Sequence, residues 1–507
     1  MGTYLNPYAF LPLPDAPCPR APMQRGILTG EIVCTLTPVS ALFIPDPEDP
    51  AAFCTDPAGL PRIPGSSLRG MLRRLYEALT DSCLPAVESV PVPVSPLGSK
   101  QPGLLRRQAD GWTLYAAHCY AAPALTAPAG QAVWFHWIRD GRQFLADAYA
   151  AGRTDTCKTQ GIAGDGCILV RRKDIPAVRM PDALAAGFPE SGMHPVWFGR
   201  EGGVLRISDS RTGSERSLHA PSDYAGDYAP CHDRERLCPA CRLFGAAPEA
   251  GEALTASRIR VTDGRFLGNA PEYAPRCTIS LPGRARVTSM EVYTRLHDGE
   301  HAAWSYDARR DADGIHPLSP ADLTLAGRRF YLHIPGCEEA PLPCRGIREI
   351  QAHPLRAGEQ NAFGFSVYFE DLTEQELKML LRTASVLGNA SPYCTKLGAG
   401  RPVGLGSVKT RVNCVRVRTV DAALPGMWDF SESPAYCKYC TGSLPEEDMP
   451  CKLLRDLLDP GYVPAMQAKG MLTDDPPVHY PPGYDWFGDM RRAGKLRPFD
   501  ASPLGGA

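Results

Sequence analysis

The sequence predicts an α+β fold: a ferredoxin-like core, similar to an RNA-recognition motif, interrupted by long insertions. Strand and helix patterns follow one another as strand, helix, strands, helix, strand. A long stretch after the first helix is rich in Pro, Gly and small residues, and the 51 prolines and 48 glycines indicate many turns. The 507 residues leave room for such insertions around one core.

The composition is that of a soluble globular protein, with 44% hydrophobic and 22% charged residues. The net charge of -2 gives no global positive field, so nucleic-acid binding requires a local basic surface. No apolar run is long enough to span a bilayer, and the first residues lack a signal-peptide pattern. We therefore expect a cytoplasmic protein with no membrane partner. Its 18 cysteines are then expected to be thiols and metal ligands rather than disulfides.

After an N-terminal arm (1–26), the stretch ILTGEIVCTLTPV (27–39) predicts a strand. A proline-broken acidic loop leads to RIPGSSLRGMLRRLYEAL (62–79), whose apolar residues recur at helical spacing. Ser66 or Ser67 is the expected N-cap, while Arg69 and Arg73 share a polar face. Unpaired N–H groups and the helix dipole make such a basic helix start suitable for a phosphate. The alternative is an ordinary capped helix with a solvated basic face.

The region from roughly 84 to 275 is interpreted as insertion material with short strands, and the core spans 27–420. Later strands are predicted in SRIRVTDGRF, FYLHI and AFGFSVYFE. A second helix is predicted in LTEQELKMLLRTASVLG, where Thr373 and Glu376 fit a capping box. In the last strand, Val408, Thr410, Val412 and Cys414 are expected to share one face. The C-terminal extension (421–507) is Pro-rich, with one short helix near Cys451–Leu458.

The stretch LGAGRPVGLGSVK has the glycine content of a phosphate-binding loop but neither common nucleotide spacing. Its glycines miss the dinucleotide-binding pattern and open a strand, and GLGSVK lacks the Walker spacing. What remains is a loop whose backbone amides approach a phosphate through Gly404 and Gly406, with Arg401 and Lys409 beside it. The alternative is a tight turn.

The stretch CHDRERLCPACRLFG predicts a zinc knuckle formed by Cys231, Cys238 and Cys241. The sequence does not rank the candidates for the fourth ligand, which are His232, His219, Cys277 and Cys119, and we take His232 as the working choice. A second, weaker group comprises Cys437, Cys440 and Cys451. Because no HExxH or deaminase pattern appears, the zinc is interpreted as structural. The alternative is a set of buried free thiols.

The acidic loop offers Asp46, Glu48, Asp49 and Asp56. Close to a basic groove, such carboxylates bind a divalent cation or orient a 2′-hydroxyl group. The alternative is a solvated loop in which Asp and Pro serve turns. The histidines form no recognisable triad, so nucleophilic hydrolase chemistry has little support.

Four stretches in chain order, NPYAFLPL, IPGSSLRGMLRRLYE, CPACRLFG and RPVGLGSVK, resemble the repeat-associated mysterious protein (RAMP) superfamily of CRISPR effectors. The similarity is to the backbone subunits of type III-like effector complexes. It implies an antiviral ribonucleoprotein in which copies of the chain lie head to tail on guide RNA, with complementary target RNA and other effector subunits as partners. It also implies a thumb-like hairpin, roughly 281–330, for which SMEVYTRLHDGEHAAWSYD is the candidate.

The resemblance further suggests which residues meet RNA. The implied contacts to guide phosphates are Ser66, Ser67, Arg69, Arg73, Arg401, Gly404, Gly406 and Lys409. Cleaving relatives carry an aspartate before the helix, which corresponds to Asp46 or Asp49 here, with Mg²⁺ as the metal. Two alternatives follow: an endoribonuclease that cuts target RNA or matures guide precursors, and a zinc-containing interaction module without RNA.

Overall fold

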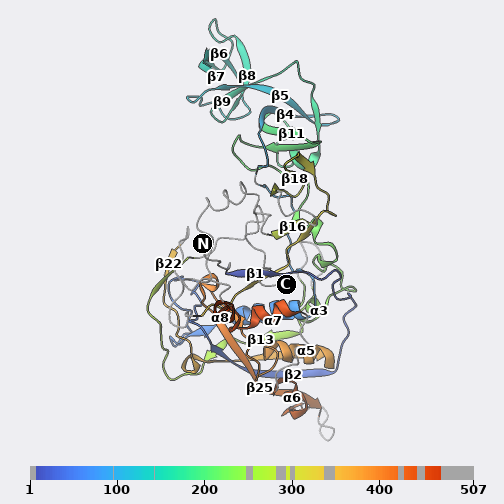
Figure 1. Ribbon diagram of the computed structural model, residues 1–507, viewed down its shortest axis with the longest axis vertical. Coiled ribbons are helices and arrows are strands. Elements are labelled where there is room, and N and C mark those ends of the chain that lie inside the picture. Colours follow the sequence, from blue (N-terminus) through green and yellow to red (C-terminus); the bar gives the residue numbers. More distant parts are fainter. Residues whose placement is uncertain are drawn as a thin grey trace.

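The computed structural model describes residues 7–94, 96–141, 143–246, 255–280, 293–296, 303–335, 349–420, 428–441 and 451–469. These residues form a mixed α/β fold with mostly strands and few helices. An elongated shape is evident in Figure 1, where a β-rich lobe lies at one end of the long axis and a helix-covered sheet at the other. No described helix is both long and apolar enough to span a membrane.

The core is an eight-stranded sheet in the order β24-β25-β2-β23-β14-β3, with β13 also pairing with β23 and β26 with β25. Its strands are β2 (Leu28–Pro38), β3 (Arg62–Ile63), β13 (Ile259–Val261), β14 (Gly264–Phe266), β23 (Phe363–Leu372), β24 (Thr395–Lys396), β25 (Ser407–Val420) and β26 (Trp428–Glu432). The predicted strand at 27–39 is confirmed as β2, which pairs antiparallel with both β23 and β25. The predicted insertion extends too far, because β13 and β14 lie within 84–275 yet pair with the core strand β23.

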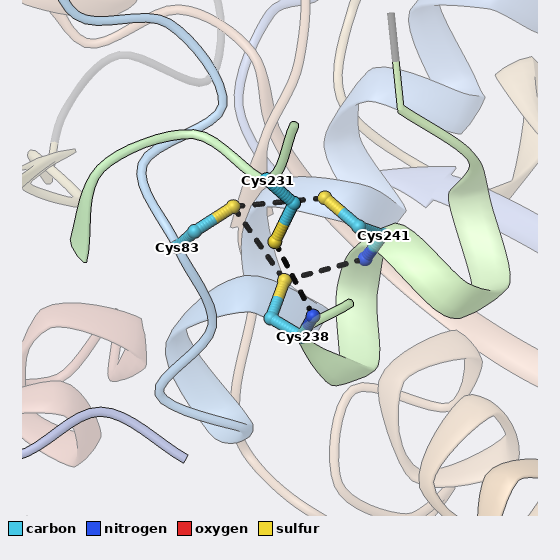
Figure 2. Close-up of side chains that lie close together, drawn as sticks. All are labelled: Cys83, Cys231, Cys238 and Cys241. Carbon is cyan, nitrogen blue, oxygen red and sulfur yellow. Dashed lines mark hydrogen bonds between the residues drawn. The ribbon is translucent and has the colours of Figure 1, made fainter. Parts of the chain in front are cut away.

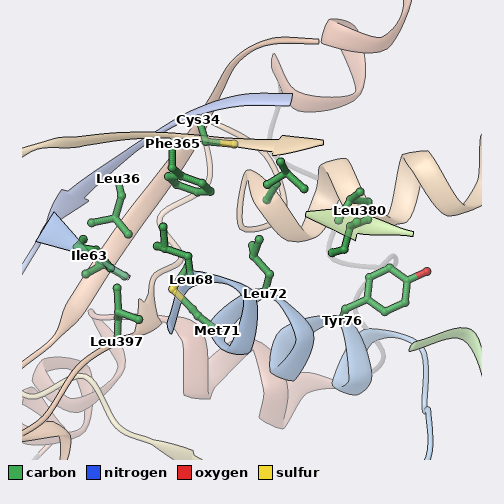
Figure 3. Close-up of a cluster of buried hydrophobic side chains, with 14 of the residues drawn as sticks. Cys34, Leu36, Ile63, Leu68, Met71, Leu72, Tyr76, Phe365, Leu380 and Leu397 are labelled. Carbon is green, nitrogen blue, oxygen red and sulfur yellow. The ribbon is translucent and has the colours of Figure 1, made fainter. Parts of the chain in front are cut away.

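Two helices, α1 (Gly65–Leu79) and α5 (Glu374–Ala384), supply apolar side chains to the same core as the sheet. Figure 3 shows Leu68, Met71 and Leu72 of α1 packed toward Leu36 and Phe365 of the strands. Burying each leucine contributes about 1.5–3 kcal/mol, which makes this layer the main source of core stability. The start of α5 confirms the predicted capping box, since the Thr373 side chain and the Glu376 carboxylate accept each other's backbone N–H.

A second face of α1 is also buried. Its Leu75, Ala78 and Leu79 share a cluster with residues of β1 (Tyr8–Leu11), β21 (Arg328–Tyr331), α7 (Lys452–Leu458) and α8 (Tyr462–Ala468). The predicted helix near Cys451–Leu458 is therefore confirmed as α7. With two faces covered, α1 keeps only one polar face for other contacts.

The strand β25 departs from the predicted alternation at Cys414. Val408, Thr410 and Val412 are buried as expected, but the pairing with β2 shifts register between Val33 and Cys34. A β-bulge inserts one residue and moves every later side chain to the other face. Val415 is buried in place of Cys414, which is half-buried.

The lobe is formed by the middle of the chain. Its elements are β4 (Gln101–Gln108), β5 (Gly111–Ala121), β6 (Ala132–Asp140), β7 (Gln143–Ala150), β8 (Thr159–Gly164), β9 (Cys167–Arg171), β10 (Val178–Met180), α2 (Asp182–Ala185), β11 (His194–Glu201) and β12 (Val204–Ser208). The order β5-β7-β6-β8-β9 closes on itself, because β9 pairs back onto β5. Closure leaves this part of the lobe without the unpaired edges that promote aggregation.

Three further small sheets are formed by strands between residues 277 and 352. They pair β15 (Cys277–Ser280) with β22 (Glu349–Ala352), β16 (Thr294–Leu296) with β20 (Leu323–Leu325), and β17 (Ala303–Trp304) with β18 (Ala308–Asp311) and β19 (Gly314–Pro317). The candidate thumb-like hairpin falls partly outside the described residues, and only β16, β17 and their neighbours are seen. Much of the C-terminal extension also lies outside them; its described part comprises β26, α6 (Pro434–Thr441), α7 and α8.

The N-terminus of α1 is capped from a distance and not by a local serine. Its first helical residue is Gly65, and no Ser66 or Ser67 side chain caps it, so that prediction is wrong. The Asp263 carboxylate accepts the Gly65 N–H at 2.7 Å and pairs with Arg62 at 3.0 Å. Glycine is required here because a Cβ at Gly65 would lie 2.4 Å from the Val261 carbonyl oxygen. The Pro-Gly-Ser-Ser turn thus serves close packing of α1 against β13.

We expect Asp263→Ala to lower the stability of the core, because it removes both the cap and the Arg62 ion pair. Losing an N-cap costs about 1 kcal/mol, which corresponds to about 2–4 °C in the melting temperature. Circular dichroism melting checks this. Ser66→Ala and Ser67→Ala are the matched controls and leave the melting temperature unchanged; a larger loss in either serine variant would contradict the assignment.

Candidate metal centre and basic groove

A group of four buried cysteines lies where the end of α1 meets the knuckle. Cys231, Cys238 and Cys241 come from the knuckle and α3 (Pro239–Phe244), and Cys83 follows the C-terminus of α1. Their sulfur atoms all lie within 4.8 Å of one another, with 3.5 Å between Cys238 and Cys83 and 3.6 Å between Cys83 and Cys241. Figure 2 shows all four side chains pointing toward a common centre.

This donor set fits a tetrahedral zinc ion. Zinc bound by four thiolates at about 2.3 Å brings the sulfur atoms to about 3.8 Å from one another, close to the observed spacing. Two backbone N–H groups also point at sulfur: Cys238 N–H donates to Cys231 Sγ at 3.3 Å, and Cys241 N–H to Cys238 Sγ at 3.4 Å. Such bonds stabilise thiolates, which are the metal-binding form of cysteine.

The working choice of His232 as fourth ligand is wrong. His232 is exposed and does not belong to the group, whereas Cys83 is 2% exposed and does. The other candidates, His219, Cys277 and Cys119, also lie outside it, and among the described residues Cys437, Cys440 and Cys451 form no such group. Sequence reasoning missed Cys83 because it precedes Cys238 by 155 residues.

Two arginines of α1 fasten the helix to the knuckle. Arg73 donates to the Gly245 carbonyl oxygen at 3.2 Å and to Cys241 Sγ at 3.7 Å. Arg69 donates to the Phe244 carbonyl oxygen, and its guanidinium lies 5.9 Å from the Phe244 ring centroid. Four thiolates around Zn²⁺ carry a net negative charge, which the Arg73 guanidinium offsets. Both arginines therefore have structural partners.

A groove of 720 Å³ runs between the polar face of α1 and the glycine-rich loop. The structure thus brings together the two stretches that the sequence analysis placed beside RNA. Residues lining it are Ile44, Pro45, Pro64, Ser66, Ser67, Gly70, Met71, Arg73, Arg74, Glu77, Pro85, Tyr331, Lys396, Leu397, Gly398, Ala399, Gly400, Arg401 and Pro402.

Of the predicted RNA contacts, Ser66, Ser67, Arg73 and Arg401 line the groove, and the other four do not. Gly404 and Gly406 are buried beneath the loop. A Cβ at Gly406 would lie 1.9 Å from the Leu397 carbonyl oxygen, so this glycine serves close backbone packing. Lys409 donates to the Ser391 carbonyl oxygen at 2.7 Å, and Arg69 is held by the knuckle.

The groove has an excess of positive charge. Four basic residues line it, Arg73, Arg74, Lys396 and Arg401, against the single carboxylate of Glu77. That carboxylate is already engaged, because its oxygens lie 2.7 Å from Arg73 and 3.9 Å from Arg328. A groove lined by more cations than carboxylates favours an anionic ligand.

Sequence reasoning missed Arg74, Lys396 and Tyr331 as groove residues. The first two carried a usable signal, since Arg74 directly follows Arg73 on the same helix and Lys396 directly precedes the glycine-rich loop. Tyr331 had none, because its strand reaches the groove only through the tertiary fold.

The acidic loop beside the groove is built from turns. Asp46 Oδ1 accepts the Glu48 N–H at 2.9 Å, Asp49 Oδ1 accepts the Ala51 N–H at 3.1 Å, and Asp56 Oδ1 accepts the Leu60 N–H at 2.9 Å. These bonds match the alternative in which Asp serves turns. In the described part of the chain, neither Asp46 nor Asp49 belongs to a group suited to a metal ion.

The chain matches no protein-family model and no curated protein. Among solved structures it is similar to Csc2 of Thermofilum pendens, with 15% sequence identity and a TM-score of 0.15. The match covers 51% of this chain and 55% of the other, so the chain spans about half the length of that relative. A likeness this distant carries no argument, and function is argued from the groove and the metal centre.

We expect one zinc ion per chain, bound by Cys83 and the three knuckle cysteines. Cys83→Ser should release it and lower the melting temperature by about 10 °C or more, because binding of a structural zinc contributes directly to folding. Elemental analysis of purified protein measures the zinc. His232→Ala is the control and keeps the metal; zinc loss in that variant, or retention in Cys83→Ser, would contradict the assignment.

Proposed function

We propose that this protein is an RNA-binding subunit of a cytoplasmic CRISPR ribonucleoprotein, with the groove between α1 and the glycine-rich loop as its RNA site. The observation that carries the proposal is the charge of this groove, where four basic residues meet one engaged carboxylate. A protein with a net charge of -2 needs such a local surface to hold a phosphate backbone.

The fold supports the same reading. We infer a ferredoxin-like unit, and the strand order β25-β2-β23-β14, with α1 after β2 and α5 after β23, supports this. The CPACRLFG knuckle, whose cysteines belong to the buried group, is one of the stretches that resemble the RAMP superfamily. We infer a backbone subunit that grips guide RNA, with base pairing to target RNA supplying sequence recognition and with further copies and other effector subunits as neighbours.

Gly70 provides independent support for a ligand in the groove. It lies in the second turn of α1 and lines the groove, and a Cβ placed on it would meet no atom within 4 Å. Glycine inside a helix costs about 1 kcal/mol relative to alanine, so neither packing nor stability accounts for it. The close approach of a ligand backbone does.

We expect Gly70→Glu to weaken RNA binding at least about tenfold, because it adds a carboxylate to the groove without a steric clash. Fluorescence anisotropy with two labelled single-stranded RNAs of unrelated sequence measures the effect, which should be equal for both. Glutamate favours helix more than glycine, so the melting temperature should not fall.

Gly70→Gln, which has the same size without the charge, and Arg200→Glu, a charge reversal on the exposed surface of the lobe, are the controls. Arg200→Glu should keep RNA affinity within about threefold, since it adds no charge to the groove. Gly70→Gln should lose part of the affinity, because its side chain occupies the space of the ligand, but less than Gly70→Glu, which adds charge as well. Equal loss in Gly70→Glu and Arg200→Glu would refute the groove as the RNA site.

A second candidate function is Mg²⁺-dependent cleavage of the bound RNA. The position of Asp46 favours it, because this residue directly follows Pro45, which lines the groove. The turn contacts of Asp46 and Asp49 favour the scaffold function instead.

We expect the chain to bind complementary guide and target RNA and leave the target intact in Mg²⁺, as shown by denaturing gels of labelled target. Asp46→Ala with Asp49→Ala should then alter neither binding nor target length. Cuts that require Mg²⁺ and disappear in the double variant would make the chain a nuclease and replace the scaffold function.

A further inference from the structure

Three arginines lie near two neighbouring aromatic rings of β21, and two of them, Arg74 and Arg401, line the groove. The Arg401 guanidinium lies 5.0 Å from the ring centroid of Tyr331, and that of Arg329 lies 5.4 Å from the same ring. Arg74 of α1 lies 5.4 Å from the ring of the neighbouring Phe330. The helix, the strand β21 and the glycine-rich loop each supply one of these cations.

These arginines differ from the others near the core. Within the described part of the chain, no carboxylate forms an ion pair with Arg74, Arg329 or Arg401, whereas Arg73 and Arg328 share Glu77. All three are half-buried, and the charges of Arg329 and Arg401 act on Arg74 while that of Arg329 acts on Arg401. The pKa of Arg74 is lowered to about 10, first by burial and then by the charges of Arg401 and Arg329. Cations held together without counter-charge are destabilising unless a ligand supplies it.

A side cavity of 30 Å³ adjoins the groove at this point and shares Met71, Arg74, Tyr331, Lys396 and Arg401 with it. This space is that of a few water molecules, too small for a nucleobase. Its inner wall includes His333, whose nitrogens contact Ser407 Oγ at 3.0 Å and the Cys394 carbonyl oxygen at 3.2 Å. Burial keeps the pKa of His333 well below its usual value, so this residue adds no charge.

We propose that Arg74 and Arg401 jointly hold a single phosphate group at this wall of the groove, with the charge of the nearby Arg329 adding to the attraction. The proposal rests on the proposed function and deepens it, because it assigns one phosphate of the RNA to a defined pocket. Guanidinium groups bind phosphate through paired, charge-assisted hydrogen bonds, and one anion among three cations offsets their repulsion. The phosphate is an internal diester or a terminal phosphate, which have the same binding chemistry.

The test is a double-mutant cycle with Arg74→Gln, Arg401→Gln and the double variant in the full chain. Anisotropy with a 3′-labelled RNA gives the affinity at several salt concentrations. If the two arginines share one phosphate, each single variant loses about tenfold in RNA affinity. The double variant then loses far less than the product of the two single-variant losses. The slope of log affinity against log salt then falls by about 0.7 in all three variants, as expected for one lost contact to a single strand. Additive losses, or unchanged binding, would overturn the proposal.

Inorganic phosphate separates the pocket from RNA binding. At constant ionic strength, phosphate should raise the melting temperature of the wild type above its value in chloride, and it should not do so in the double variant. A phosphate effect without any RNA binding would retain the pocket and refute the proposed function. RNA binding that the arginine variants leave intact would refute the pocket and retain the proposed function.

To identify the source of the phosphate, the affinities of two RNAs are compared. They have the same sequence, but one carries a 5′-phosphate and the other a 5′-hydroxyl group. If the wild type prefers the RNA with the 5′-phosphate and Arg401→Gln does not, the pocket binds a terminal phosphate. If both RNAs bind equally and Arg401→Gln weakens both to the same extent, the pocket binds an internal diester. Without ligand, Arg401→Gln should melt at or above the wild-type temperature, because it relieves repulsion. A lower melting temperature would contradict the repulsion on which the pocket is argued.

Discussion

The junction between α1 and the zinc knuckle is the constraint on which the rest of the groove depends. Cys83 follows the helix, which ends at Leu79, and its sulfur atom lies close to those of the three knuckle cysteines. A metal bound by these four residues would therefore fix the C-terminal end of α1. Asp263 fixes the opposite end through the Gly65 N–H. A helix held at both ends presents one polar face in one orientation, which is what a site for a repeating phosphate backbone requires.

Glu77 links this junction to the charge of the groove. Its carboxylate is buried and lies between Arg73, which also contacts Cys241 Sγ, and Arg328. Removing one of the three residues would leave a buried charge without its partner, which would destabilise the fold. Glu77 forms its ion pairs with these two arginines, and no ion pair joins it to Arg74 one turn away. The excess charge of the groove is thus a consequence of how the metal centre is attached.

Local patterns in the sequence predicted the parts of the fold that depend on neighbouring residues. The strand at 27–39, the helix that ends at Leu79 and the capping box of Thr373 and Glu376 follow from periodicity and caps. The long-range partners were not predictable in this way. Asp263 is 198 residues from Gly65, and Cys83 is 155 residues from Cys238, so no spacing rule connects them. The bulge in β25 likewise arises from pairing with β2.

The glycine-rich loop was correctly predicted to lie beside α1, but Gly404 and Gly406 were wrongly predicted to face the groove. A run of glycines indicates that some atom approaches the backbone closely, but it does not identify that atom. At Gly398 the approaching atom is the Phe43 carbonyl oxygen, which seats the loop on the segment after β2. At Gly406 it is the Leu397 carbonyl oxygen, so this glycine lets the loop close on itself. Seating the loop in turn carries Lys396 and Arg401 to the groove. In the proposed function, the glycines therefore act indirectly, by positioning the cations of the groove.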